Sequence, residues 1–168
     1  LDKFVTTVKD VAGPTKFAKL AKHINIETVN ACNEFDNIAK SQYINDIEQI
    51  TIGRTDLSQS MNKPINSDEV LQLTAGIINK CKALNKSISV GGNITPNIAV
   101  KIAETAAPDR MNTREVGFTL SKCRDIRKTV VEALKFETEL IAHKIELFNY
   151  QISLLTDRRQ KIERRLDL

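Results

Sequence analysis

The chain has 168 residues, of which 41% are hydrophobic and 27% charged, and its formal net charge is +4. These values are typical of a soluble protein and allow one domain with a core. The sequence contains no apolar run long enough to cross a bilayer and no signal-peptide pattern, so we expect no membrane partner. Residues 157–168 carry a surplus of two basic side chains. Because aromatic residues are scarce, we expect no nucleic-acid partner either.

The cysteines indicate a reducing compartment. Cys32, Cys81 and Cys123 are far apart, odd in number and form no CxxC pair. This spacing argues against a disulfide framework and against a zinc knuckle. We therefore predict a cytoplasmic protein.

The first half of the chain alternates helical and strand patterns. The opening LDKFVTTVKDVAG has apolar residues at helical spacing and a stop signal at Gly13-Pro14. KHINIET alternates and predicts a strand over residues 22–27, and VNACNEFDNIAKS predicts a helix. IEQITIG is the second predicted strand. We expect its Ile-Thr-Ile run to be buried on both faces of a sheet.

The alternation continues through the middle of the chain. SDEVLQLTAGIINKCKALN predicts a helix with Ser67 as its N-cap, and SISVGG predicts a third strand. ITPNIAVKIAETA predicts a helix with Pro96 in its first turn, and TREVGFT a fourth strand. The order β-α-β-α-β-α-β predicts an α/β fold with a parallel sheet and right-handed crossovers.

The C-terminal part has a different pattern. Residues 125–166 contain no Gly or Pro, and eight apolar residues follow spacings of 7, 4, 3, 4, 3, 7 and 4. We call them the heptad seam: Leu134, Ile141, Ile145, Phe148, Ile152, Leu155, Ile162 and Leu166. The seam predicts a long helix, interrupted near Thr156-Asp157, that packs against a helix of another subunit. Packing of this helix onto the chain's own sheet is the alternative.

Polar residues follow three of the predicted strands. They lie at residues 25–28, 53–56 and 91–93. The carboxyl ends of parallel strands meet at one edge of a sheet, and neighbouring strands are about 4.8 Å apart. Glu27 and Asp56 could therefore share a cation, and two carboxylates plus waters are a usual site for Mg²⁺ or Mn²⁺.

The second of these segments could also hold an anion. Gly53 would let a ligand approach the backbone, and the amides of Thr55 and Asp56 could then receive a carboxylate group. The alternative is that Asp56 only caps the following helix.

Two segments resemble a known enzyme superfamily. INIETVNACNEFDNI and ITIGRTDLSQSM are similar to the corresponding motifs of metal-dependent pyruvate aldolases and citrate lyase β-subunits, and SVGGNIT and EALKFETEL look like a subgroup of them. In this resemblance Glu27 and Asp56 match the metal-ligating carboxylates, and Thr55 and Asp56 match residues whose amides hold the carboxylate of a 2-oxo acid. Asn25 and Gly53 join them as candidate substrate-binding residues.

Arg54 is a further candidate substrate-binding residue. It replaces the proline that the family often has at this position. A second anionic group on the substrate would explain the change, and an exposed structural Arg is the other reading.

The resemblance implies a (β/α)₈ barrel that uses Mg²⁺ or Mn²⁺. It implies a carbon–carbon lyase of the aldolase type, in which the enolate of a 2-oxo acid such as pyruvate, stabilised by the metal, attacks an aldehyde or forms by cleavage. Some relatives act on acyl-CoA thioesters, and the motifs do not separate the two.

The length of the chain limits what the resemblance can assign. A full barrel of this kind needs about 250 residues, and the four predicted strands correspond to its second half. We expect half of a barrel over residues 1–123, with an exposed apolar edge and face, and a helical oligomerisation element over residues 124–168. The catalytic His and the substrate-binding Arg of the family lie in the first half, so no catalytic residue is assigned.

The two histidines are not assigned to the site. His23 and His143 are interpreted as structural or surface residues.

The sequence also allows a second function. The alternative function is that of a non-catalytic half-barrel or assembly subunit, which forms a homo-oligomer through its heptad helix.

Overall fold

The computed structural model describes residues 1–166. Asp167, which the charge count above includes, and Leu168 lie outside the described residues. The chain divides into two compact units, residues 1–131 and residues from 132 onward. The predicted boundary between residues 123 and 124 stays a prediction.

A five-stranded sheet organises the first unit. Its strands lie side by side in chain order: β1 (His23–Ile26), β2 (Gln49–Gly53), β3 (Ser87–Gly91), β4 (Arg110–Asn112) and β5 (Gly117–Thr119). The first four run parallel, and β5 pairs antiparallel with β4. Parallel neighbours in sequential order are also the arrangement of a barrel. The described residues form an open sheet with β1 and β5 at its edges.

The predicted fourth strand is partly wrong. TREVGFT was expected to be a fourth parallel strand, but the parallel strand is β4, and only Gly117–Thr119 of TREVGFT forms a strand, which is antiparallel. Four residues separate β4 from β5, and so short a connection can only turn the chain back. β4 is too short for its three residues to show an alternating pattern.

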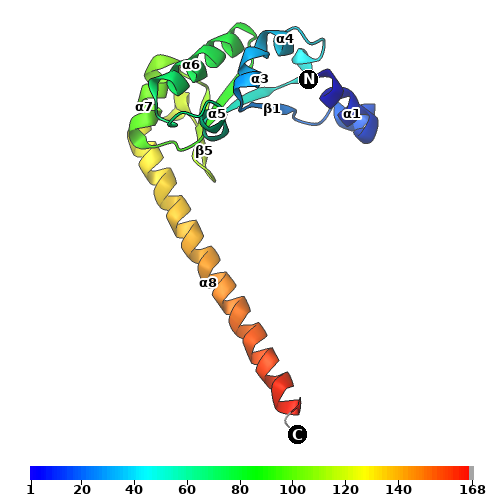
Figure 1. The fold of residues 1–168 in the computed structure, drawn as a ribbon, viewed down its shortest axis with the longest axis vertical. Coiled ribbons are helices and arrows are strands. Elements are labelled where there is room, and N and C mark those ends of the chain that lie inside the picture. The colour runs from blue at the N-terminus through cyan, green and yellow to red at the C-terminus, as the bar shows by residue number, and fades with distance from the viewer. Residues whose placement is uncertain (167–168) are drawn as a thin grey trace. The chain divides into compact units, whose positions relative to one another are not determined.

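Helices connect the strands. They are α1 (Asp2–Ala12), α2 (Pro14–Phe17), α3 (Val29–Asn33), α4 (Phe35–Ala39), α5 (Arg54–Ser60), α6 (Asp68–Ala83) and α7 (Pro96–Thr105), with short 3-10 helices at Ile44–Asp46 and Leu120–Lys122. The Ser67 hydroxyl accepts a hydrogen bond from the amide of Val70 at 3.4 Å, which confirms the predicted N-cap of α6. Pro96 begins α7, as predicted. Figure 1 shows α3, α4, α6 and α7 along one side of the sheet.

The two faces of the sheet differ in polarity. The face under the helices is apolar: Ile24 is half-buried, and the other residues of this face are buried, namely Ile26, Ile50, Ile52, Ile88, Val90 and Met111. The alternate residues of β1, β2 and β3 form the other face: His23, Asn25, Gln49, Thr51, Ser87 and Ser89. The expected burial of β2 on both faces is therefore wrong within this chain, and so is the expected apolar open face. Polar side chains line it.

α8 (Ile126–Leu166) is a single helix of 41 residues. The expected interruption near Thr156-Asp157 is absent from it, because the Thr156 hydroxyl donates to the carbonyl of Ile152 at 2.9 Å and so fits within the helix. From Ile141 to Leu166 the seam side chains are 48–79% exposed. Among the described residues, none of the helices combines the length and the apolar composition that a membrane span requires.

The fold predicts which thiol reacts first. All three cysteines are free, Cys32 and Cys81 are buried, and burial raises the pKa of the Cys81 thiol to about 12 and also raises that of Cys32. We expect iodoacetamide at pH 8 to label Cys123 first and the other two only after denaturation, because the thiolate is the reactive form. Peptide mapping by mass spectrometry measures this order. Early labelling of Cys81 in the folded protein would contradict the fold.

Candidate functional site

A row of four residues crosses the carboxyl ends of the parallel strands. Ile26 pairs with Ile52, so Glu27, which follows β1, lies beside Gly53. Gly53 pairs with Gly91, and the pairing of β3 with β4 continues the row to Asn112. We call Glu27, Gly53, Gly91 and Asn112 the carboxyl-end row. Its members are on the polar face of the sheet, because side chains alternate along a strand.

The two glycines of the row leave room for the two long side chains. A Cβ atom on Gly53 would lie 2.6 Å from Oε1 of Glu27, and a Cβ atom on Gly91 would lie 2.5 Å from Nδ2 of Asn112. Such contacts do not occur between real atoms. The Glu27 carboxylate and the Asn112 amide therefore lie directly over the backbone of Gly53 and Gly91, at the carboxyl ends of neighbouring strands.

Hydrogen bonds orient both ends of the row. Asn25 Nδ2 donates to Oε1 of Glu27 at 2.9 Å, and the hydroxyl of Ser89 donates to Oδ1 of Asn112 at 2.7 Å. Because Oδ1 of Asn112 is occupied, its Nδ2 faces Gly91. The row thus offers an acceptor at one end and a donor at the other.

Asp56 lies in the first turn of α5, and the alternative reading, in which Asp56 only caps this helix, is wrong. The N-cap of α5 is Gly53, and α5 has no side-chain cap. One turn later on the same helix face, the hydroxyl of Ser60 accepts a hydrogen bond from the amide of Val29 at 3.1 Å. This bond ties α5 to the segment that directly follows Glu27. The helix face that carries Asp56 is therefore turned toward the end of β1.

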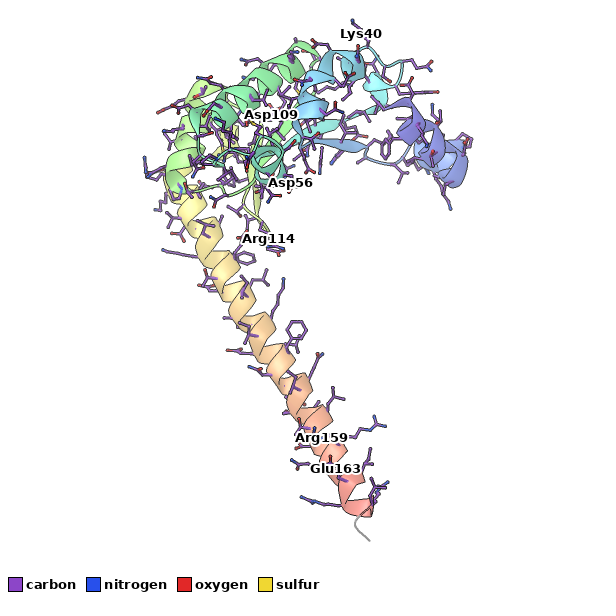
Figure 2. All side chains as sticks on the ribbon, viewed as in Figure 1. Lys40, Asp56, Asp109, Arg114, Arg159 and Glu163 are labelled. Atoms are coloured by element: carbon purple, nitrogen blue, oxygen red, sulfur yellow. The ribbon has the colours of Figure 1, made fainter. Side chains whose placement is uncertain are left out.

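Asp109 shows by contrast what a structural carboxylate does here. It precedes β4 and accepts a hydrogen bond from the amide of Ile88 at 2.8 Å, near the amino end of the sheet. Asp56 is exposed at the carboxyl end, at the start of α5. Figure 2 labels both residues.

Arg54 is buried, and the expectation of an exposed structural Arg is wrong on this point. Its side chain is 0% exposed. One guanidinium nitrogen donates to the carbonyl of Gly92 at 3.1 Å, and the other donates to the carbonyl of Ile65 at 2.6 Å and to Oδ1 of Asn66 at 3.0 Å. Burial lowers the pKa of Arg54 to about 10. Its contacts are with the protein, and a contact with substrate stays a prediction.

The loop after β3 lies against the start of α5. Gly92 has φ of 96°, which favours glycine, and a Cβ atom there would lie 2.6 Å from the amide nitrogen of Thr55. Arg54 fixes this loop through the Gly92 carbonyl. The predicted anion-binding segment and the third strand end are thus in direct contact.

Sequence reasoning missed Asn112 and Ser89. The signal for Asn112 would have been a polar residue at the end of β4, but this strand was not recognised. Ser89 was taken only as part of a strand. The histidines lie elsewhere: His23 begins β1 at the opposite end of that strand, and His143 is 79% exposed on α8, 3.4 Å from Glu146. Within residues 1–166, no cluster of three or more His, Cys, Asp or Glu side chains is placed to hold a metal ion.

Comparison with known proteins finds matches among solved structures. No protein-family model matches the chain, and neither does any curated protein. An HpcH/HpaI aldolase/citrate lyase family protein from Burkholderia cenocepacia J2315 is 15% identical, with 75% of this chain and 44% of that chain covered and a TM-score of 0.50. The citrate synthase SbnG is 18% identical, with 87% and 52% covered and a TM-score of 0.45.

The comparison defines the fold. About three quarters of the chain is similar in fold to the aldolase/citrate lyase family structure from Burkholderia cenocepacia, which confirms at the level of fold the resemblance inferred from the sequence. The chain spans about half the length of the solved structures that it matches. At these identities the likeness gives neither the metal nor the substrate.

The glycines of the site predict two different responses to a methyl group. Gly53→Ala meets only the flexible side chain of Glu27, so we expect the fold to remain and the carboxylate to move. Gly92→Ala meets backbone of α5 at a positive φ, so we expect it to lower the free energy of unfolding by about 1–3 kcal/mol. Urea unfolding followed by circular dichroism compares the two. Equal losses would contradict the described geometry.

Arg54 predicts a structural loss that lysine does not repair. Arg54→Met leaves the carbonyls of Gly92 and Ile65 without their donor, and we expect a loss of at least ~2 kcal/mol in the free energy of unfolding. Arg54→Lys should also be destabilised, because one ammonium group cannot span three acceptors. Thermal and urea unfolding measure both variants. Wild-type stability in Arg54→Lys would show that the fork geometry is unimportant.

Proposed function

We propose that this chain carries part of the active site of a divalent-metal-dependent carbon–carbon lyase of the aldolase type. Its substrates would be a 2-oxo acid such as pyruvate together with an aldehyde, or an acyl-CoA. The observation that carries the proposal is the carboxyl-end row with the Glu27 carboxylate over Gly53, beside the helix face that bears Asp56. The fold likeness to an aldolase/citrate lyase family structure supports it.

The donor set fits Mg²⁺ or Mn²⁺. Glu27 and Asp56 would supply carboxylate oxygens from neighbouring strand ends, and the Asn25 amide, which donates to one oxygen of Glu27, would orient that ligand. Hard divalent ions of this kind are commonly bound by one or two carboxylates and keep several coordination positions for water and substrate. When bound, the ion would supply Lewis-acid stabilisation of the enolate of the 2-oxo acid.

The chain's own residues would bind and orient the substrate. Thr55 and Asp56 are exposed in the first turn of α5, and a substrate carboxylate could bind to their amides. Gly53 leaves room for the Glu27 carboxylate beside this turn, and Arg54 holds the Gly92 loop against the same turn. Because the chain spans about half of the matched structures, we assign no catalytic base within it.

Metal binding tests this proposal directly. We expect the protein to bind Mn²⁺ and both Glu27→Gln and Asp56→Asn to weaken that binding at least ~10-fold, since each removes one charged ligand. Isothermal titration or the electron paramagnetic resonance signal of free Mn²⁺ measures the affinity. Glu104→Gln, an exposed carboxylate on α7, is the matched control. Equal Mn²⁺ affinity in all four proteins would refute the metal site.

A second candidate function rests on a different observation. The seam of α8 is exposed, as expected of an assembly subunit that forms a homo-oligomer. A protein that multimerises through α8 but binds no Mn²⁺ and releases no 2-oxo acid from hydroxy-2-oxo acids would favour this function. Mn²⁺-dependent release would favour the lyase.

A further inference from the structure

The exposed seam on α8 has a defined length. Val130 is fully buried and Leu134 is half-buried, so the exposed part of the seam begins at Ile141. From there it extends to Leu166, which is 79% exposed, a length of about 38 Å along the helix. Exposed apolar patches of this size mark interaction surfaces in soluble proteins.

A second apolar stripe lies on the opposite side of the helix, but it is shorter. It consists of Phe136, Leu140, Leu147, Tyr150 and Leu154. His143 interrupts it, and Asp157 and Lys161 occupy its next positions. The heptad seam is therefore the longer surface for a partner helix.

The charges along α8 complement one another when two copies run in opposite directions. Residues 157–166 carry five basic and two acidic side chains, and residues 132–146 carry four acidic and two basic ones. An antiparallel pair places the basic segment of each copy beside the acidic segment of the other. A parallel pair places the two basic segments together, which is unfavourable.

Arg159 strengthens this distinction. It occupies a seam position, four residues after Leu155 and three before Ile162. In a parallel pair in register it would face Arg159 of the second copy inside the seam. In an antiparallel pair it faces Ile141 of the second copy. A polar residue at one seam position is a known determinant of how coiled coils align.

We propose that α8 pairs antiparallel with α8 of a second copy of this chain along the heptad seam. The longest overlap sets Leu134 against Leu166 of the second copy and Ile145 against Leu155 of the second copy. Two kinds of opposite-charge pair then flank the seam, Glu137 with Arg165 and Lys135 with Glu163, and each occurs twice because the dimer is two-fold symmetric. One kind of like-charge pair, Lys144 with Arg158, remains at the rim. This inference does not depend on the metal site proposed above.

Sedimentation velocity of the full chain tests the surface. We expect a dimer, and we expect Ile145→Ser/Ile152→Ser to raise its dissociation constant at least 100-fold. The matched control is Leu147→Ser/Leu154→Ser on the second stripe, whose side chains are 56% and 50% exposed against 54% and 60% for the seam pair. This control should leave the dimer unchanged. Far-ultraviolet circular dichroism verifies that both variants keep their helix content.

Two outcomes of this experiment overturn the proposal. One is a wild-type chain that remains monomeric even when its concentration is raised 100-fold. The other is dissociation by the second-stripe variant while the seam variant stays paired, which would place the interface on the opposite side of α8.

Disulfide trapping tests the direction. In a Cys123→Ser background, chains with Ile145→Cys are mixed with chains that carry Leu155→Cys and are then oxidised. An antiparallel pair predicts the mixed disulfide and little self-linked Ile145→Cys product. Self-linked Ile145→Cys dimers, or the failure of the mixed disulfide to form, would overturn the antiparallel arrangement. Mn²⁺ affinity of the same proteins is measured separately, so failure of the pairing is distinguishable from failure of the metal site.

Discussion

The candidate site depends on the close approach of long polar side chains to glycine backbone. Glu27 and Asn112 occupy space that a Cβ atom on Gly53 or Gly91 would fill. Because parallel strands place equivalent positions side by side, these four residues form one continuous row. The glycines therefore do more than end their strands. They determine where a carboxylate and an amide can lie at this edge.

The buried guanidinium group of Arg54 connects the loops around the site. Arg54 begins α5, and its guanidinium reaches the Gly92 loop on one side and the Ile65–Asn66 segment on the other. Its Nε has no hydrogen-bond partner among the described residues. Burial disfavours the charged form, and three hydrogen bonds offset part of this cost. Arg54 thus acts as a clamp between two loops that are far apart in the sequence.

Sequence patterns predicted the parts of the fold that depend on residues close together in the sequence. The N-cap of α6, the proline in the first turn of α7 and the first three strands follow from side-chain chemistry and apolar periodicity within short windows. Glu27, Gly53 and Asp56 were found because residues after parallel strands converge. Asn112 was missed because β4 is too short for periodicity, and its pairing with β3 is a long-range contact. The burial of Arg54 was missed for a similar reason: its three acceptors come from loops 11 to 38 residues away.

The sheet and α8 differ in how strongly they require a partner. The open face of the sheet carries hydroxyl, amide and imidazole groups, which water can hydrate at little cost. The seam of α8 carries isoleucine, leucine and phenylalanine side chains that are about half exposed or more. Burial of apolar area is the main favourable term in association. The driving force for assembly therefore lies in α8. A surface that covers the polar face of the sheet must instead match its hydrogen-bonding groups, so a contact with this face is selective rather than strong.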